Sequence, residues 1–490
     1  MSIIIVGLGP ASLDQIDVRT SGILHDPNVD VIVRTADHPA AQELSKHRPV
    51  ASCDDLYDSH DSFDAVYAAV TQRVLEAGRT GDVAYAVPGS PLVGERAVSA
   101  LRRDAEEAGI PVTIVPARSF LDLAFGAVGI DPIADGLQVL DARDLPDPLP
   151  LHVPTIVTQV DSALRAADLS VSLARVLDDE TGVSVLDRLG DPDQIVRGMT
   201  VAELARYEGG PRTSVFIPRH DVGLLGLVAT NRVLREQCPW DMQQTHHSLL
   251  SHLVEEAYET ADALGQLPAA APEGEVDFGA YAEVEDELGD LLLQVVFHST
   301  LAAEAGAFDI DEVAELNRRK LVRRHPHVFG GVEVDGASDV LANWEQIKSE
   351  EKQRESLMDD IPRAMPGVAR AVKVQKRAAS VGFDWQEAAP VFDVLRDEID
   401  ELRDAAGDTD ETLSELGDVL FAAINLARHL RVDPEIALRG SVERFMARFR
   451  IVEAEFASSG QPMTDASQDE LEQAWSRAKS ELATDFEQST

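Results

Sequence analysis

The 490-residue sequence has two cysteines, Cys53 and Cys238, and only 5% aromatic residues. Two cysteines are too few for a disulfide framework and do not have metal-ligand spacing, so we expect ordinary reduced thiols. No run of about 18 apolar residues occurs, which argues against a membrane-spanning helix. The N-terminus also lacks the basic region and cleavage pattern of a secretory signal. These absences predict a cytoplasmic protein.

Basic residues are also scarce, because 43 Lys and Arg stand against 87 Asp and Glu, a formal net charge of −44. An anionic surface repels a polyanionic duplex, which argues against general nucleic-acid binding. A small phosphorylated substrate is still compatible, because divalent cations bridge anionic partners. Apolar residues make up 44% of the chain, and its length predicts two or three domains.

The first part of the chain has the pattern of an α/β fold, in which short β-branched runs alternate with helix-like stretches. The proline-rich segment 145–150 is interpreted as a linker between two lobes. After about residue 220, apolar spacings of three and four continue to about residue 483, which predicts an all-α second half. The expected strands span residues 2–6, 31–33, 83–87, 112–115 and 155–158.

An internal repeat occupies the helical half. Four elements recur in the same order: clustered acids, Glu-Leu-Gly-Asp, two bases one turn apart, and a Trp followed four residues later by Lys. The first copy contains Glu255, Glu256, Glu259, Glu287, Asp290, Lys320, Arg324, Trp344 and Lys348. The second copy contains Asp397, Glu398, Glu401, Glu415, Asp418, Arg444, Arg448, Trp475 and Lys479. We therefore expect an α/β domain over 1–220 and helical units over 221–358 and 359–490.

The acids of each copy are spaced to share helix faces, because residues three and four apart lie on one side of a helix. If the two acid-bearing helices pack antiparallel, the repulsion between their carboxylates calls for cations. Ligation by oxygen alone favours Mg²⁺, with Mn²⁺ as a substitute, over Zn²⁺. A solvated acidic face is the alternative in so acidic a chain, and the ordered repetition favours the metal site.

The residues around the acids carry further expectations. Gly289 and Gly417 lower helix propensity, so we expect a facing helix to approach closely there, and the apolar runs 291–297 and 419–424 to be buried on most sides. The paired bases are expected to neutralise polyphosphate oxygens. Each Trp either stacks near a nucleobase or is buried in the bundle beside a snorkelling Lys. His325 and His327 are expected to end a helix.

From about residue 223 to residue 483 this constellation resembles the MazG family of all-α nucleoside triphosphate pyrophosphohydrolases. Asp397 departs from the pattern, because the family prefers Glu at that position. The resemblance implies Mg²⁺-dependent hydrolysis of standard or modified nucleoside triphosphates to the monophosphate and pyrophosphate, with a role in cleaning the nucleotide pool. Besides the acids, the motifs that carry it are Cys238-Pro-Trp-Asp241 with Gln244-Thr245, residues 323–329, residues 376–385 and Asn425-Leu-Ala-Arg-His429.

The same resemblance assigns roles to the repeated residues. The acids of both copies would hold Mg²⁺ ions that grip the triphosphate and activate water, and Glu256 or Glu398 is the candidate for orienting that water. The bases, tryptophans and lysines of both copies would bind the substrate. Both units keep their acids, so both are candidates for activity, and a homodimer is expected.

The N-terminal third carries the motifs Val6-Gly-Leu-Gly-Pro10, Val87-Pro-Gly-Ser-Pro91, residues 116–120 and residues 129–132. With these motifs it resembles the tetrapyrrole methylase superfamily, whose members bind S-adenosylmethionine between two α/β lobes. This resemblance would make Gly7, Gly9, Pro10 and Gly89 cofactor-binding residues. Ala11, Ser90 and Ala117 depart from the family pattern, so two alternatives stay open: a methyltransferase, or a non-catalytic ligand sensor that regulates the hydrolase.

Overall fold

The computed structural model describes residues 1–60, 62–336, 339–340, 343–344, 347, 356–363 and 365–488, with the backbone alone for 483–488. The chain divides into two compact units, Met1–Leu250 with Leu292–Leu301, and Ser251–Leu291 with Ala302–Thr490. Among the described helices, none combines the length and apolar character needed to cross a membrane.

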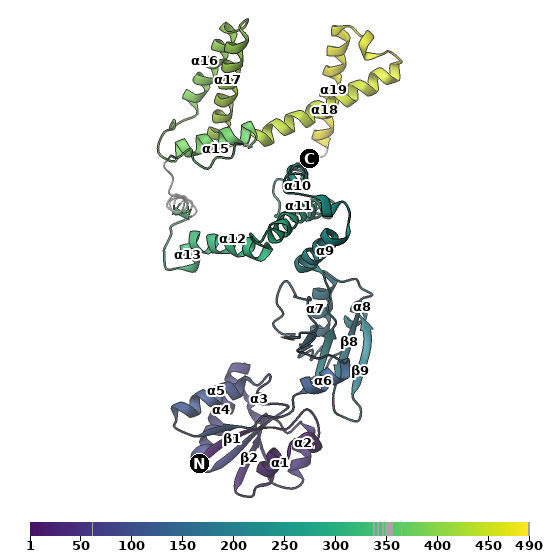
Figure 1. Ribbon diagram of the computed structural model, residues 1–490, viewed down its shortest axis with the longest axis vertical. Coiled ribbons are helices and arrows are strands. Elements are labelled where there is room, and N and C mark those ends of the chain that lie inside the picture. Colours follow the sequence, from purple (N-terminus) through teal and green to yellow (C-terminus); the bar gives the residue numbers. More distant parts are fainter. Residues whose placement is uncertain are drawn as a thin grey trace. The chain divides into compact units, whose positions relative to one another are not determined.

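The first sheet forms an α/β layer structure with helices on both faces (Figure 1). Its elements are β1 (Ser2–Gly7), α1 (Val18–His25), β2 (Val29–Val33), α2 (Pro39–Ser45), β3 (Ala51–Ser52), α3 (Asp54–Ser59), α4 (Phe63–Thr80), β4 (Asp82–Val87), α5 (Arg96–Glu107) and β5 (Val112–Ile114). The strands run parallel in the order β3-β2-β4-β1-β5. Val70 and Leu101 of α4 and α5 pack on one face, and Leu24 and Leu44 of α1 and α2 on the other. Covering both faces explains why the central strands are nearly continuous apolar runs.

The second sheet is mixed rather than parallel. Its elements are α6 (Phe120–Val128), β6 (Gln138–Asp141), β7 (Thr155–Thr158), α7 (Ala163–Ala174), β8 (Gly182–Asp187), β9 (Ile195–Thr200), α8 (Val201–Leu204) and β10 (Thr213–Ile217). In the order β6-β7-β10-β8-β9, only β6 and β7 are parallel neighbours. Leu169 and Leu173 of α7 pack into the core of this sheet.

All five strands expected from the sequence form, and the expected linker is wrong. Segment 145–150 lies between β6 and β7, inside the second sheet's domain, where Leu145 and Leu149 pack against the core. The chain passes from one sheet to the other through α6 instead. A proline-rich segment breaks regular structure, yet its leucines still bury apolar surface, so composition alone misplaced the division.

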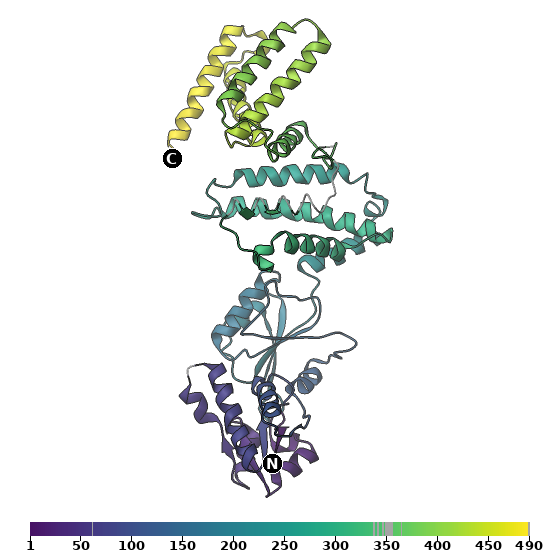
Figure 2. The same ribbon diagram turned by 90° about the vertical axis from the view of Figure 1, so that its left-hand side faces the viewer.

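After β10 every described element is helical, as the apolar spacing predicts. The helices are α9 (Gly223–Gln237), α10 (Leu250–Gln266), α11 (Phe278–Glu304), α12 (Ile310–Arg324), α13 (Pro326–Phe329), α15 (Gly367–Ala379), α16 (Ala389–Asp404), α17 (Thr409–His429), α18 (Pro434–Ser459) and α19 (Gln468–Gln488). Asp309, Asp408 and Asp433 cap the N-termini of α12, α17 and α18 by accepting backbone N–H hydrogen bonds. Figure 2 shows α16 and α17 as long helices lying side by side.

His325 lies at a helix end, as expected, whereas His327 lies inside the next short helix. His325 follows the last residue of α12 and precedes α13, and its Nδ1 lies 2.7 Å from the carbonyl oxygen of Leu321. The short helix α13 begins with Pro326, whose missing N–H needs no partner at a first helical position.

Candidate active sites

The first acid cluster forms where α10 meets α11. Glu256 of α10 and Glu287 and Asp290 of α11 each place one carboxylate oxygen within 4.8 Å of the other two. The hydroxyl of Thr260 ties the helices together at this level, because it lies 2.7 Å from the Glu256 carbonyl oxygen and 3.0 Å from that of Glu287. Three oxygen donors at these separations are close enough to share one hard cation.

Glu255 and Glu259, also predicted as ligands, lie outside this group of three. Burial raises the pKa of Glu256, and the neighbouring carboxylates of Asp290 and Glu259 raise it further. Burial and then the Glu259 carboxylate likewise raise the pKa of Glu287. Both burial and repulsion between the negative charges disfavour the ionised carboxylates, and a proton or a cation relieves that cost.

The second acid cluster forms between α16 and α17. Glu398 and Glu401 of α16 and Glu415 of α17 place carboxylate oxygens within 4.8 Å of one another, whereas Asp397 and Asp418 lie outside the group. Burial raises the pKa of Glu398, and the carboxylates of Glu401, Asp418 and Glu415 add to the shift in that order. The second cluster thus takes two acids from its first helix and one from its second, the reverse of the first cluster.

The predicted bases of the first copy lie on α12. The guanidinium of Arg324 lies over the ring of Trp344, 5.4 Å from its centroid, in a cation–π contact. Lys320 makes no ion pair with the acid cluster among the described residues. Lys348 lies outside the described residues. The substrate-binding roles of these four residues stay predictions.

The predicted substrate residues of the second copy lie on α18 and α19. The ring of Trp475 lies 5.0 Å from that of Phe445 and packs against the buried side chains between the two helices. This packing favours the bundle interpretation of Trp475 over stacking on a nucleobase. Arg448 buries its Nε without a hydrogen-bond partner among the described residues, and neither it nor Arg444 forms an ion pair with the cluster acids there. Lys479 is exposed.

Two expectations about the flanks of the acids are wrong for the single chain. A Cβ added at Gly289 or Gly417 would have no atom within 4 Å, so no facing helix approaches closely there. The apolar runs are partly open as well, because Leu292 and Val295 are each 39% exposed and Leu420 is 57% exposed. A hydrophobic run shows that a side chain prefers burial, but it does not say that the same chain supplies the cover.

The sequence reasoning missed a polar network beyond the second acid cluster. Arg428 of α17 donates two hydrogen bonds to Asp384, from Nη1 at 2.7 Å and from Nη2 at 2.5 Å, and His429 Nε2 lies 3.0 Å from the same carboxylate. Asn425 Oδ1 accepts from Arg428 Nη2 at 2.7 Å. The hydrogen bond from Arg428 lowers the pKa of Asp384 from 3.8 to about 2. The complementary charges were visible in the sequence, but nothing there places residue 384 beside residue 428.

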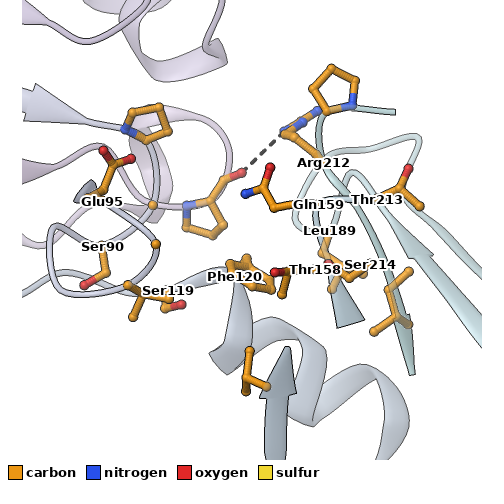
Figure 3. Close-up of a pocket in the computed structure, with 18 of the residues that line it drawn as sticks. Ser90, Glu95, Ser119, Phe120, Thr158, Gln159, Leu189, Arg212, Thr213 and Ser214 are labelled. Atoms are coloured by element: carbon orange, nitrogen blue, oxygen red, sulfur yellow. Dashed lines mark hydrogen bonds between the residues drawn. The ribbon is translucent and has the colours of Figure 1, made fainter. Parts of the chain in front are cut away.

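A second candidate site is the interlobe cleft, a cavity of about 240 Å³ between the first and second sheets (Figure 3). Glu95 is buried on its wall and lies 3.1 Å from Arg34 Nη1, and burial raises the pKa of Glu95 to about 7. His38 is also buried, with its Nδ1 unpartnered among the described residues. Further polar residues that line the cleft are Ser90, Ser119, Thr158, Gln159, Arg212, Thr213 and Ser214.

The glycines predicted to bind a cofactor join two loops at the edge of this cleft. Gly9 N donates to the Gly89 carbonyl at 3.1 Å, and Gly89 N donates to the Gly9 carbonyl at 2.8 Å. A Cβ at Gly7 would lie 2.2 Å from the Gly89 oxygen, so only glycine permits this approach. Pro10 and Gly89 line the cleft, and the Pro10 carbonyl accepts from Arg212 at 3.3 Å. Their cofactor-binding role stays a prediction.

Comparisons with known proteins agree with this division of the chain. Residues 2–205 match the Tetrapyrrole (Corrin/Porphyrin) Methylases, and residues 244–329 match the MazG nucleotide pyrophosphohydrolase domain. The "Uncharacterized protein YabN" of Bacillus subtilis (strain 168) is 36% identical over 493 residues, which cover 97% of this chain and 98% of YabN.

Two relatives match about half of the chain. The nucleoside triphosphate pyrophosphohydrolase of Escherichia coli (strain K12) is 43% identical over 263 residues, 52% of this chain and 95% of the relative. The "Nucleoside triphosphate pyrophosphohydrolase/pyrophosphatase MazG" of Thermotoga maritima is 39% identical over 246 residues, 50% of this chain and 90% of the relative. Since this chain spans nearly the whole of each, it belongs to the MazG family of nucleotide pyrophosphohydrolases, with a tetrapyrrole methylase domain in its N-terminal part.

Proposed function

We propose that this chain hydrolyses nucleoside triphosphates, standard or modified, to the monophosphate and pyrophosphate. The observation that carries the proposal is the pair of carboxylate triads, Glu256 with Glu287 and Asp290, and Glu398 with Glu401 and Glu415. The relatives named as nucleoside triphosphate pyrophosphohydrolases support the same reaction. Such an enzyme removes unwanted triphosphates from the nucleotide pool.

The donor set of each triad fits Mg²⁺, with Mn²⁺ as a substitute. All three donors are carboxylate oxygens within 4.8 Å of one another, and neither His nor Cys belongs to either triad. Burial and the neighbouring carboxylates raise the pKa values of Glu256 and Glu398, and the cost of holding these charges together would fall when a cation binds. A bound Mg²⁺ supplies positive charge to triphosphate oxygens and makes nearby water more acidic. The remaining acids, Glu255, Glu259, Asp397 and Asp418, would complete the two coordination shells.

Glu256 and Glu398 are the candidates for orienting the attacking water. Each lies in a triad, so its carboxylate stands where it could accept a hydrogen bond from a water molecule beside the bound ion. Water held by this carboxylate would attack the α-phosphorus, so that the bond to the bridging oxygen breaks and pyrophosphate leaves.

The bases of both copies are proposed to bind the outer phosphates, with completion of the site by a second protomer. Lys320 lies on α12, and Arg444 and Arg448 lie on α18. Among the described residues none of the three forms an ion pair with a cluster acid. Large apolar side chains are exposed on the same helices, among them Leu321 at 49% and Phe445 at 55%. Exposed apolar surface of this kind marks protein contacts, which supports the expected homodimer. Arg324, Trp344, Lys348 and Lys479 keep their predicted substrate-binding roles, whereas the packing of Trp475 against Phe445 favours a place in the bundle core for that ring.

A second function is proposed for the interlobe cleft, on the ion pair of the buried Glu95 carboxylate with the partly buried Arg34 and on the unpartnered Nδ1 of His38. Buried polar groups that face a cavity without full pairing are typical of a ligand site. S-adenosylmethionine is the proposed ligand, and a methyltransferase or a sensor that regulates the hydrolase are the two candidate roles. Calorimetric titration tests binding; absence of both heat and thermal stabilisation would eliminate this ligand.

The proposed domains remain 1–220, 221–358 and 359–490.

The hydrolase is tested by incubating the purified full-length chain with a panel of nucleoside triphosphates, with Mg²⁺, with Mn²⁺ and with a chelator. We expect monophosphate and pyrophosphate in the presence of either metal, and no product with the chelator. Diphosphate and inorganic phosphate as the products would rule out attack at the α-phosphorus and overturn the proposal.

A further inference from the structure

Asn425 of α17 lies next to the ion pair of Arg428 and Asp384. Asn425 is 8% exposed, and its Oδ1 accepts hydrogen bonds from Arg428 Nη2 at 2.7 Å and Nε at 3.2 Å. Arginine only donates, so the amide must turn its oxygen toward Arg428. Its Nδ2 is left as a donor on the other side, and none of the described residues accepts a hydrogen bond from it.

Helix α17 places this donor at a fixed distance from the second acid cluster. Asn425 follows Asp418 by seven residues, which is two helical turns, so the two share a face of α17 about 10 Å apart. Glu415, a member of the triad, lies on the same face one turn earlier. A nucleotide whose phosphates lie at the acids and whose long axis follows α17 would bring its base to Asn425.

The first acid cluster has no counterpart of this donor. Counted from the Glu-Leu-Gly-Asp motif, Phe297 occupies the position of Asn425, and Leu301 that of His429. Phe297 is 3% exposed and packs with Leu301 and Leu249. An apolar wall can exclude a base or accept it, but it cannot distinguish a carbonyl from an amino group by hydrogen bonding.

We propose that Asn425 determines base specificity at the second acid cluster by donating from Nδ2 to a ring carbonyl of the nucleobase. Guanine O6 and uracil O4 are acceptors, whereas adenine and cytosine carry an amino donor at the same positions. An amino group facing Nδ2 would leave two donors unpaired, which costs free energy in a buried site. The preferred substrates are therefore the nucleoside triphosphates of guanine and uracil. The inference rests on the proposed pyrophosphohydrolase function.

Asp384 and Arg428 are positioning residues in this proposal, whereas Asn425 contacts the base. They do not reach the base in this proposal; their ion pair fixes the amide of Asn425 so that it cannot rotate to present its oxygen. A purely structural role for Asn425 would affect all four nucleotides equally. The ratio of kcat/KM between GTP and ATP, and that between UTP and CTP, therefore distinguishes a specificity role from a structural role.

The experiment uses the full-length chain with Glu256→Ala, so that turnover comes from the second cluster. We measure kcat/KM for GTP against ATP and for UTP against CTP. We expect kcat/KM to be about tenfold higher for GTP than for ATP and for UTP than for CTP, which corresponds to one hydrogen bond. Asn425→Ala should bring both ratios close to one. Asn425→Asp, whose carboxylate only accepts, should invert them.

Gln375→Ala is the matched control, because it removes another buried amide from the same region. Gln375 is 6% exposed and donates from Nε2 to the Phe421 carbonyl at 2.8 Å, so its loss should leave both ratios unchanged. Asn425→Ser replaces the alanine variant if that variant does not fold, with the same expected ratios.

Three outcomes would overturn the inference, and they differ from one another. Equal loss for all four nucleotides in Asn425→Ala would mean a structural role. Absence of turnover in Glu256→Ala, with activity in the unsubstituted chain, would mean that the second cluster does not work alone. Absence of pyrophosphate release from any nucleotide in the unsubstituted chain would remove the proposed function itself, and the inference with it.

Discussion

The two acid clusters share a motif and differ in what surrounds it. In the first, one acid of α10 meets two of α11, and the helix continues into buried apolar residues such as Phe297 and Leu301. In the second, two acids of α16 meet one of α17, and the helix continues into the network of Asn425, Arg428 and Asp384. Both clusters offer carboxylate oxygens alone, whereas the flanking turns differ: they are apolar beyond the first cluster and polar beyond the second.

The largest expected effect comes from removing one glutamate from each acid cluster. The double variant Glu256→Ala with Glu398→Ala should lose more than about a hundredfold in kcat, since even outer-shell partners of a metal cost 10- to 100-fold. Each single variant should keep the turnover of the other cluster. Steady-state pyrophosphate release measures all three.

The single variants sharpen this result. Loss of all turnover in Glu256→Ala alone would show that the first cluster is the whole enzyme, and the converse would hold for Glu398→Ala. Unchanged activity in the double variant would show that neither triad is the active site.

The next effect concerns stability and separates the two flanking regions. Asp384→Asn leaves the partly buried Arg428 without its charged partner and should lower the free energy of unfolding by about 2–3 kcal/mol. In the first copy, Thr300 occupies the position equivalent to Arg428, and its hydroxyl donates a hydrogen bond to Asn231 Oδ1 at 2.8 Å. Thr300→Ala should cost only about 1 kcal/mol. Denaturant unfolding of both variants measures the difference.

The pH dependence of the same variant provides its control. The pKa of Asp384 is lowered to about 2 in the folded chain, so its contribution to stability is present above the ordinary value of 3.8 and is lost as the pH falls from there toward 2. Asp384→Asn should lack this part of the acid dependence. Identical acid unfolding of both chains would contradict the assigned ion pair.

A smaller effect tests the repulsion within the triads without metal. The pKa values of Glu256 and Glu398 are raised, so the folded chain loses stability as the pH rises through the ordinary glutamate value of 4.5 toward the raised values. Glu256→Gln and Glu398→Gln should therefore raise the Tm of the chelator-treated chain at neutral pH. Both should also reduce the rise in Tm that Mg²⁺ gives the unsubstituted chain. A fall in the metal-free Tm of both variants would show that the acids do not repel.

The smallest effect comes from the glycines between the acids. A Cβ at Gly289 or Gly417 would meet no atom within 4 Å, and Ala is the better helix former, so each Gly→Ala change should stabilise by about 0.5–1 kcal/mol. Thermal unfolding measures both variants. Destabilisation at only one glycine would reveal a close neighbour that distinguishes the two clusters.

The sequence predicted the helices and strands better than the contacts between them. β-Branched runs placed all five expected strands, and apolar spacing placed the all-helical region, because both patterns depend on local periodicity. The division between the lobes was misplaced at residues 145–150, since proline content marks irregular backbone whether or not its leucines are buried. The close helix approach expected at Gly289 and Gly417 does not occur, because low helix propensity does not identify a neighbour.

By itself the sequence determined the family and the acid motifs, because these depend on residue types and on spacings along one helix. Only the tertiary structure decided which acids meet: Glu256, Glu287 and Asp290 on one side, and Glu398, Glu401 and Glu415 on the other. It also decided that Asp384 meets Arg428 across 44 positions of the chain. The physical reason is that helical periodicity fixes the face of each side chain, whereas contacts between helices depend on packing that no local spacing encodes.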